Sequence, residues 1–202
     1  MFLEKILIFI FISSNAFTGE YLQMKDLPYS SSEKGHLKNG ALLIESDVKE
    51  FKFSAKKKGQ SFVMKGAGLH KRSCSKALRV LSRYQDYSKY LSFIKTSEYS
   101  DKTQRLNFLL SHILLPFDMR LYFKIKRITS PGIYVFIFDR GFLKDLIGQI
   151  HVSSYKNRCL FYAHIFWKGE KTSVPSSVLE FFSEALGKMA IRNLFKISGS
   201  SP

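Results

Sequence analysis

Alternating apolar and polar side chains predict most of the strands of this protein. In residues 119–126, Met119, Leu121, Phe123 and Ile125 alternate with Arg, Tyr and Lys residues, which is typical of an antiparallel strand with one buried face. Residues 48–55 show a similar alternation. Further strands are expected in apolar-rich runs at 62–70, 106–115, 133–138, 147–153 and 160–167.

Apolar residues at helical spacing follow the second of these strands. Ala77, Leu78, Leu81 and Tyr84 share one face, and a short second helix is expected at 86–91. This region separates the first two strands from the remaining ones.

The end of the chain predicts a long amphipathic helix. Ser177 and Glu180 have the spacing of a capping box, and the apolar face that follows continues to about Ile197. The order of strands, short helices, about six antiparallel strands and a final helix predicts an α+β fold, with the helices on one face of a sheet.

Composition limits the class of protein. The chain has 202 residues, of which 45% are hydrophobic and 15% aromatic, which excludes a disordered chain. Two Cys are too few for a four-Cys zinc module or a disulfide-stapled miniprotein. The sequence contains no nucleophile elbow, P-loop or dinucleotide fingerprint, and it predicts no catalytic residue and no cofactor.

The first residues predict export. The apolar run Ile6–Ile12 is followed by Ser14, Asn15 and Ala16, which is the pattern of a signal peptide cleaved after Ala16. The alternative is an uncleaved anchor, although the run is shorter than the roughly 20 residues that span a membrane. We therefore expect a signal peptide at 1–16, a polar lead-in at 17–47 and one domain at 48–198, in a periplasmic or secreted protein.

The net charge of +16 indicates an anionic partner. An exported protein rarely meets nucleic acid, so an anionic membrane surface is the expected partner and nucleic acid is not. The candidate contacts are Arg79, Arg83, Lys124 and Lys126. The alternative is a solvated cationic surface without a partner.

Three stretches resemble the START-like superfamily, which includes polyketide cyclases and coenzyme Q-binding proteins. They are the segment 62–94, the run from Pro116 to Arg120, and the run from Phe138 to Lys144. The chain departs from the family pattern at Ser92, where a proline is usual. The resemblance, which covers residues 62–197, implies a helix-grip fold: a curved antiparallel sheet of about seven strands around a C-terminal helix, with an apolar cavity between them.

A hydrophobic ligand, such as a lipid, is the expected occupant of that cavity. The sheet would contribute Leu110, His112, Met119, Leu121, Phe123 and Ile125, and the helix Phe182, Leu186 and Met189. His112 is expected to face inward from a strand. It leaves open a cyclase- or hydrolase-type enzyme that uses a cavity His or Tyr. A filled core that docks on an anionic envelope surface is the third alternative.

The remaining His and Cys residues predict two further pairings. A turn centred on Asn157 and Arg158 would place His151 opposite His164 on the outer face of the sheet, without a third ligand for a metal, so no metal site is expected. The helix-grip order would make the first and last strands neighbours, which brings Cys74 near Cys159, and an oxidising compartment would join them. Two separate buried thiols are the alternative.

Overall fold

The computed structural model describes residues 22–113, 115 and 117–200. The predicted signal peptide and its cut after Ala16 lie outside the described residues. The helices are η1 (Met24–Asp26), α1 (Ser31–Lys38), α2 (Cys74–Leu81), η2 (Tyr84–Asp86), α3 (Tyr87–Tyr90) and α4 (Ser176–Ser200). The strands are β1 (Leu43–Lys52), β2 (Lys58–His70), β3 (Ile94–Ser100), β4 (Arg105–Leu110), β5 (Met119–Ile125), β6 (Gly132–Gly141), β7 (Ile147–Tyr155) and β8 (Arg158–Glu170).

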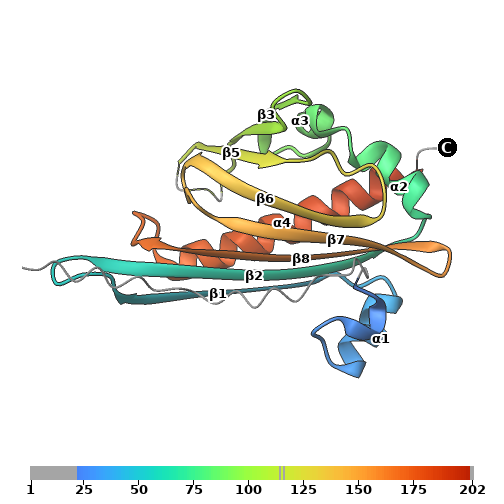
Figure 1. The fold of residues 1–202 in the computed structure, drawn as a ribbon, viewed down its shortest axis with the longest axis horizontal. Helices are drawn as coiled ribbons and strands as arrows, with labels where there is room; N and C mark the ends of the chain where they lie inside the picture. The colour runs from blue at the N-terminus through green and yellow to red at the C-terminus, as the bar shows by residue number, and fades with distance from the viewer. Residues whose placement is uncertain (1–21, 114, 116, 201–202) are drawn as a thin grey trace, which may run out of the picture.

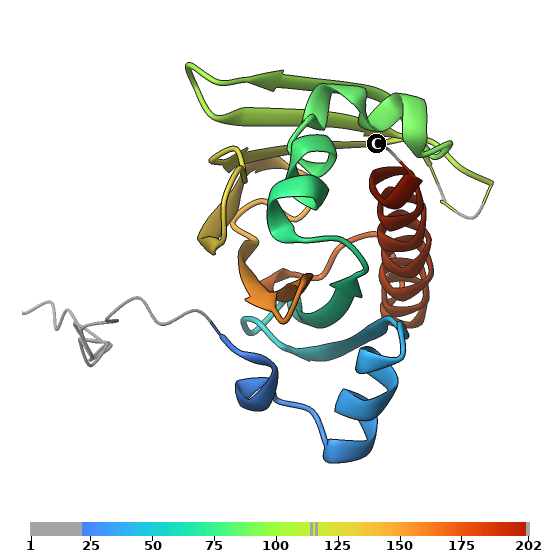
Figure 2. The same ribbon diagram turned by 90° about the vertical axis from the view of Figure 1, so that its right-hand side faces the viewer.

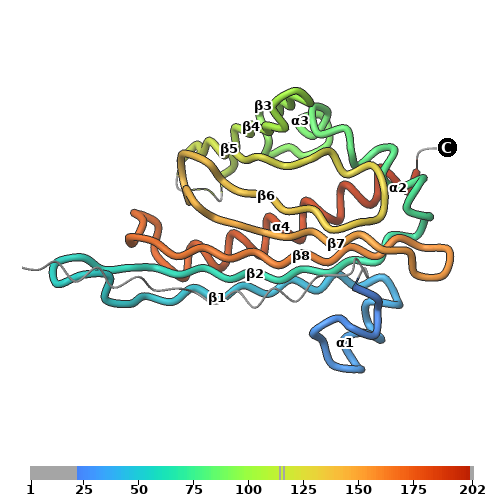
Figure 3. The backbone as a smooth tube through the Cα atoms, viewed as in Figure 1, coloured from blue at the N-terminus to red at the C-terminus, as the bar shows by residue number. Residues whose placement is uncertain are grey.

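The eight strands form one antiparallel sheet in the order β1-β2-β8-β7-β6-β5-β4-β3 (Figure 1). Figure 2 shows this sheet curving from β3 round to β1, with α4 along its open side. The β1–β2 hairpin reaches beyond the other strands at one end (Figure 3). The predicted α+β helix-grip fold is confirmed, with eight strands in the sheet where about seven were expected.

The strand predicted at 106–115 is shorter in the structure. β4 ends at Leu110, where its two neighbours also stop: Leu110 pairs with Ile94 on one side and with Met119 on the other. The chain leaves the sheet here, and the described residues between β4 and β5 (111–113, 115, 117 and 118) lie outside any strand. His112 therefore lies in this connection and not on the inner face of a strand.

Residues 22–47, the described part of the predicted polar lead-in, pack against the sheet. Ser30 and Glu33 cap α1 reciprocally, with the Ser30 amide donating to the Glu33 carboxylate at 2.7 Å. Leu37 of α1 is fully buried. A small cluster on the outer face of the sheet joins this segment to β2 and β8, through Met24, Leu27, Tyr29, Leu37, Ala67, Leu69, Leu160 and Tyr162. These few apolar residues lie between polar ones, so the sequence shows little periodicity here.

The predicted disulfide is present. Cys74 and Cys159 are joined with an S–S distance of 2.01 Å and a Cα–Cα distance of 4.6 Å. The reason is the strand order: β2 pairs with β8, and His70 at the end of β2 lies opposite Cys159. α2 begins at Cys74, so its first residue lies beside the start of β8. A disulfide is consistent with an oxidising compartment.

Candidate ligand-binding cavities

The first cavity lies between the sheet and the N-terminal half of α4. It has a volume of about 230 Å³ and an almost entirely apolar wall. Ser183 contributes the hydroxyl of this wall. It donates to the Glu180 carbonyl at 2.8 Å, and its oxygen lies 3.1 Å from the Ser46 hydroxyl. The apolar wall is formed by Phe62, Met64, Leu110, Leu115, Met119, Leu121, Phe136, Phe138, Phe142, Leu143, Leu146, Ile165, Val174, Leu179, Phe182 and Leu186.

The second cavity, of about 200 Å³, lies against the C-terminal half of α4. Its two ring hydroxyls are already bonded to the backbone. Tyr87 donates to the Leu81 carbonyl at 2.7 Å, and Tyr84 accepts from the Ile128 amide at 3.0 Å. Burial raises the pKa of both phenols above the ordinary value, so they stay neutral. Other residues of the wall are Leu78, Leu81, Leu106, Phe108, Phe123, Ile125, Ile128, Ile150, Phe161, Ile191, Leu194 and Phe195.

Stacked aromatic rings lie between the two cavities. Phe123 lines the second cavity and Phe138 the first, and their rings stack at 5.0 Å with an angle of 12° between the planes. Phe108 packs edge-on against Phe123 at 5.4 Å. Each cavity alone is smaller than the roughly 300–1,000 Å³ of a typical small-molecule pocket, and the two together fall in that range.

The predicted site residues divide between the two cavities. Leu110, Met119, Leu121, Phe182 and Leu186 line the first cavity, and Phe123 and Ile125 line the second. Met189 packs against a cluster of residues from α3, β3 and β4, outside both linings. His112 is also outside both linings. No periodic pattern in the sequence indicates Phe142, Leu143 and Leu146 as wall residues, because the β6–β7 connection that carries them has no regular secondary structure. The place of Tyr87 in the second cavity was likewise not predicted.

The start of α4 is fixed by a buried side chain of β2. Gln60 is fully buried; its amide donates to the Ser176 hydroxyl at 3.0 Å, and its carbonyl accepts from the Thr172 hydroxyl at 2.9 Å. This holds the β8–α4 connection against the sheet and sets the position of Val174 and Leu179 in the wall of the first cavity.

The far end of α4 is fixed by His70, which is fully buried. Its Nδ1 accepts from the Arg72 amide at 3.0 Å, so Nε2 carries the proton and donates to the Ser198 hydroxyl at 2.9 Å. That hydroxyl donates in turn to the Leu194 carbonyl at 2.6 Å. Burial lowers the pKa of His70 below its usual value, which keeps the ring neutral.

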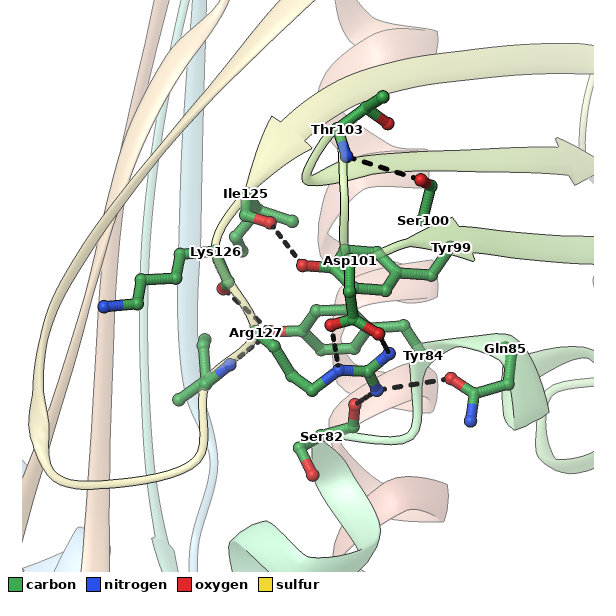
Figure 4. A network of polar contacts seen from close by, with 11 residues as sticks. Ser82, Tyr84, Gln85, Tyr99, Ser100, Asp101, Thr103, Ile125, Lys126 and Arg127 are labelled. Atoms are coloured by element: carbon green, nitrogen blue, oxygen red, sulfur yellow. Dashed lines mark hydrogen bonds and ion pairs between the residues drawn. The ribbon is translucent and has the colours of Figure 1, made fainter.

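Arg127 holds the region beside the second cavity together (Figure 4). Its guanidinium donates to both carboxylate oxygens of Asp101, at 2.8 and 2.9 Å, and to the Ser82 carbonyl. The same group lies 4.5 Å from the ring centroid of Tyr99, whose hydroxyl donates to the Ile125 carbonyl at 3.0 Å. The guanidinium lowers the pKa of Asp101. These contacts tie the β3–β4 hairpin to the end of β5 and to α2.

His151 and His164 are not opposite one another, contrary to the sequence-based expectation. The β7–β8 turn is centred one residue earlier than predicted, with Tyr155 opposite Arg158, so His151 faces Tyr162 and His164 faces Gln149. His151 is buried, and its ring lies 5.8 Å from that of Tyr162. In the described part of the chain, no three His, Cys, Asp or Glu side chains come together as metal ligands would.

The charged residues predicted to contact an anionic membrane surface are exposed, and they lie on different elements. Arg79 lies on α2 and Arg83 just after it, whereas Lys124 and Lys126 lie on and just after β5. Within the described residues, no helix is long and apolar enough to cross a membrane.

Comparison with known proteins identifies the fold. No protein-family model matches the chain, and no curated protein matches it. Among solved structures, a conserved protein from Geobacillus kaustophilus is 14% identical with a TM-score of 0.56, and covers 68% of this chain and 95% of its own. The Zhui aromatase/cyclase from Streptomyces sp. R1128 is 8% identical with a TM-score of 0.57, covering 69% and 94%. Ara h 8.0201 is 9% identical with a TM-score of 0.54, covering 70% and 99%. The likeness to these structures confirms the helix-grip fold.

Proposed function

We propose that this protein binds a hydrophobic ligand, a lipid or a lipid-like molecule, in the two cavities between the sheet and α4. The observation that carries the proposal is the first cavity, with about 230 Å³ of space and a wall that offers almost no polar atoms. Water gains few hydrogen bonds in such a space, whereas an apolar ligand gains roughly 25 cal/mol for each Å² of apolar surface removed from water. A ligand chain longer than one cavity would pass the rings of Phe123 and Phe138.

Binding is better supported than catalysis. Among the described residues of the two walls, the side-chain polar groups are Ser183, Tyr84 and Tyr87, and each is already hydrogen bonded within the protein. A cyclase- or hydrolase-type reaction would need an acid or base that is free to reach a substrate. The cavity His on which that alternative depended, His112, lies in the β4–β5 loop.

We place this function outside the cytoplasm. The basis is the signal peptide predicted at 1–16 together with the disulfide between Cys74 and Cys159. N-terminal sequencing of the protein purified from its own envelope tests this placement, since a protein with Met1 retained would contradict cleavage after Ala16.

Trp substitutions inside the first cavity, with a matched substitution on the exposed side of α4, test ligand binding. Leu186→Trp fills the first cavity, so we expect binding of a fluorescent fatty-acyl probe to weaken at least about tenfold, while the circular dichroism spectrum stays that of the wild type. Leu121→Trp fills the same cavity from the sheet. Phe181→Trp is the control, because Phe181 is 59% exposed on the same helix. Wild-type affinity in a folded Leu186→Trp protein would refute the proposal.

A second candidate function, docking on an anionic membrane surface, has its own observation. Ile137, Ile147 and Phe166 lie side by side on the outer face of β6, β7 and β8, and each is 38–44% exposed. Lys124 of β5 pairs with Ile137, so a cation continues this apolar row. Apolar side chains beside cations suit the surface of an anionic bilayer.

Vesicle sedimentation tests this docking. We expect binding to phosphatidylglycerol vesicles at low salt and release at high salt, because the reach of exposed charges falls below about 8 Å above physiological ionic strength. Reversing Lys124 and Lys126 to Glu should abolish sedimentation, whereas reversing Arg79 on α2 and Arg83 just after it should not. Equal loss in both variants would point to net charge alone, and sedimentation that ignores salt would contradict docking.

A further inference from the structure

The charged residues of α4 follow one row along the helix. Glu180, Glu184, Lys188, Arg192 and Lys196 are spaced by four residues and are the Asp, Glu, Lys and Arg residues of this helix. The two acids occupy the N-terminal half, where Glu184 accepts from the backbone amide of Ser46 on β1 at 2.9 Å. The C-terminal half carries three cations and no acid. The row therefore becomes basic where it passes the start of β1.

A third pocket, of about 240 Å³, lies at that point, in the seam between α4 and the residues that lead into β1. Lys188 and Arg192 contribute two cations to its wall, and among the described residues no carboxylate lines it. Lys188 does pair with Glu184, but at 3.4 Å and with a side chain that is 44% exposed, so this ion pair is weak. In the part of the chain that the structure describes, no carboxylate pairs with Arg192. The remaining wall is formed by Gly40, Ala41, Leu42 and Phe195.

Phe195 belongs to both this basic pocket and the second apolar cavity. Its ring packs against Phe161 at 5.5 Å and over Gly68, where a Cβ atom would come within 2.9 Å of it. The glycine thus allows the aromatic ring to lie directly on β2. Phe195 is therefore a wall shared by the pocket with two cations and the apolar cavity of about 200 Å³.

We propose that Lys188 and Arg192 bind the anionic headgroup of an amphiphilic ligand, whose acyl chain passes Phe195 into the second cavity. The inference rests on the proposed function and specifies its ligand class: a chain that ends in a carboxylate or a phosphate. Arginine suits either group, because its planar donors match two oxygens at once. The headgroup stays at the seam, where it remains hydrated, and only the chain enters the apolar interior.

The test compares two probes with the same chain and different headgroups, cis-parinaric acid and its methyl ester. Their fluorescence reports binding directly. We expect the wild-type protein to bind the acid about tenfold more tightly than the ester, the value of one charge-assisted contact. The double variant Lys188→Gln, Arg192→Gln should lose this preference and keep its affinity for the ester. Lys196→Gln, with its cation one turn further along α4 and outside the pocket, is the control and should keep the preference.

Each outcome decides something. Equal binding of the two probes by the wild type, or a control that loses the preference as fully as the double variant, would overturn the headgroup site and leave ligand binding intact. Failure of both probes to bind would overturn the proposed function as well. Displacement of parinaric acid by oleate but not by oleoyl lysophosphatidate identifies a carboxylate as the headgroup, and the reverse identifies a phosphate.

Discussion

Removal of the disulfide should cause a large loss of stability. Cys74 and Cys159 are 85 residues apart in sequence and both are buried. Closing a loop of that length restricts the unfolded chain, and the chain-entropy relation gives about 4.6 kcal/mol at 25 °C. This is a large part of the 5–15 kcal/mol that is typical of the whole free energy of unfolding.

The double variant Cys74→Ala, Cys159→Ala should therefore unfold at a much lower urea concentration, and its Tm should fall by about 9–18 °C. Wild-type protein with the bridge reduced is the matched control, because it keeps both sulfur atoms and loses only the constraint. The loss of stability in the reduced wild type should account for most of the loss of stability in the double variant.

Peptide mapping without reduction must first show the bridge in the native protein. With the bridge present, a loss below about 1 kcal/mol in the double variant would refute the loop-closure argument. Two alkylatable thiols in the native exported protein would refute the bridge itself. A large loss in the variant with none in the reduced wild type would assign the effect to packing around the two side chains.

Two further predictions concern charged and polar contacts that hold the ends of the fold. Arg127→Met should lower the Tm at neutral pH, as measured by calorimetry. Because the pKa of Asp101 lies below its usual value, its carboxylate stabilises the folded state above about pH 4, and the Tm difference between wild type and variant should shrink as the pH falls through the folded pKa. An equal Tm at neutral pH would contradict this role. The pKa of His70 lies below its usual value, so its contribution to the free energy of unfolding is present above about pH 6.5 and is lost as the pH falls toward the folded pKa. Urea unfolding should therefore show a free energy of unfolding that decreases as the pH is lowered. The same pH dependence in His70→Gln would contradict the assignment.

Local patterns along the chain predicted most of the strands, the long C-terminal helix and the class of fold. Period-two alternation in 119–126 and the long apolar face after Ser177 are local signals, because a strand or helix that buries one face must repeat at the spacing of its own backbone. They place Leu121 on the inner side of the sheet and Leu186 on a long helix without knowledge of the rest of the chain. The resemblance to START-like proteins added the strand order, from which the disulfide followed.

Tertiary structure alone decided where the inward-facing residues meet. The alternation could not show that Leu121 and Phe123, neighbours on one face of β5, line different cavities, because that depends on Phe108 of β4 and Phe138 of β6, whose rings pack against Phe123. It could not end β4 at Leu110, because that depends on where β3 and β5 stop.

The register of β7 against β8 and the basic pocket at the seam were equally inaccessible from the sequence. A shift of two residues preserves the face of every side chain, so alternation fits both the expected pairing of His151 with His164 and the observed pairing with Tyr162. Lys188 and Arg192 meet the residues before β1 across some 150 positions of sequence. Local patterns determine which face of an element is buried, whereas the contacts between faces depend on the whole chain.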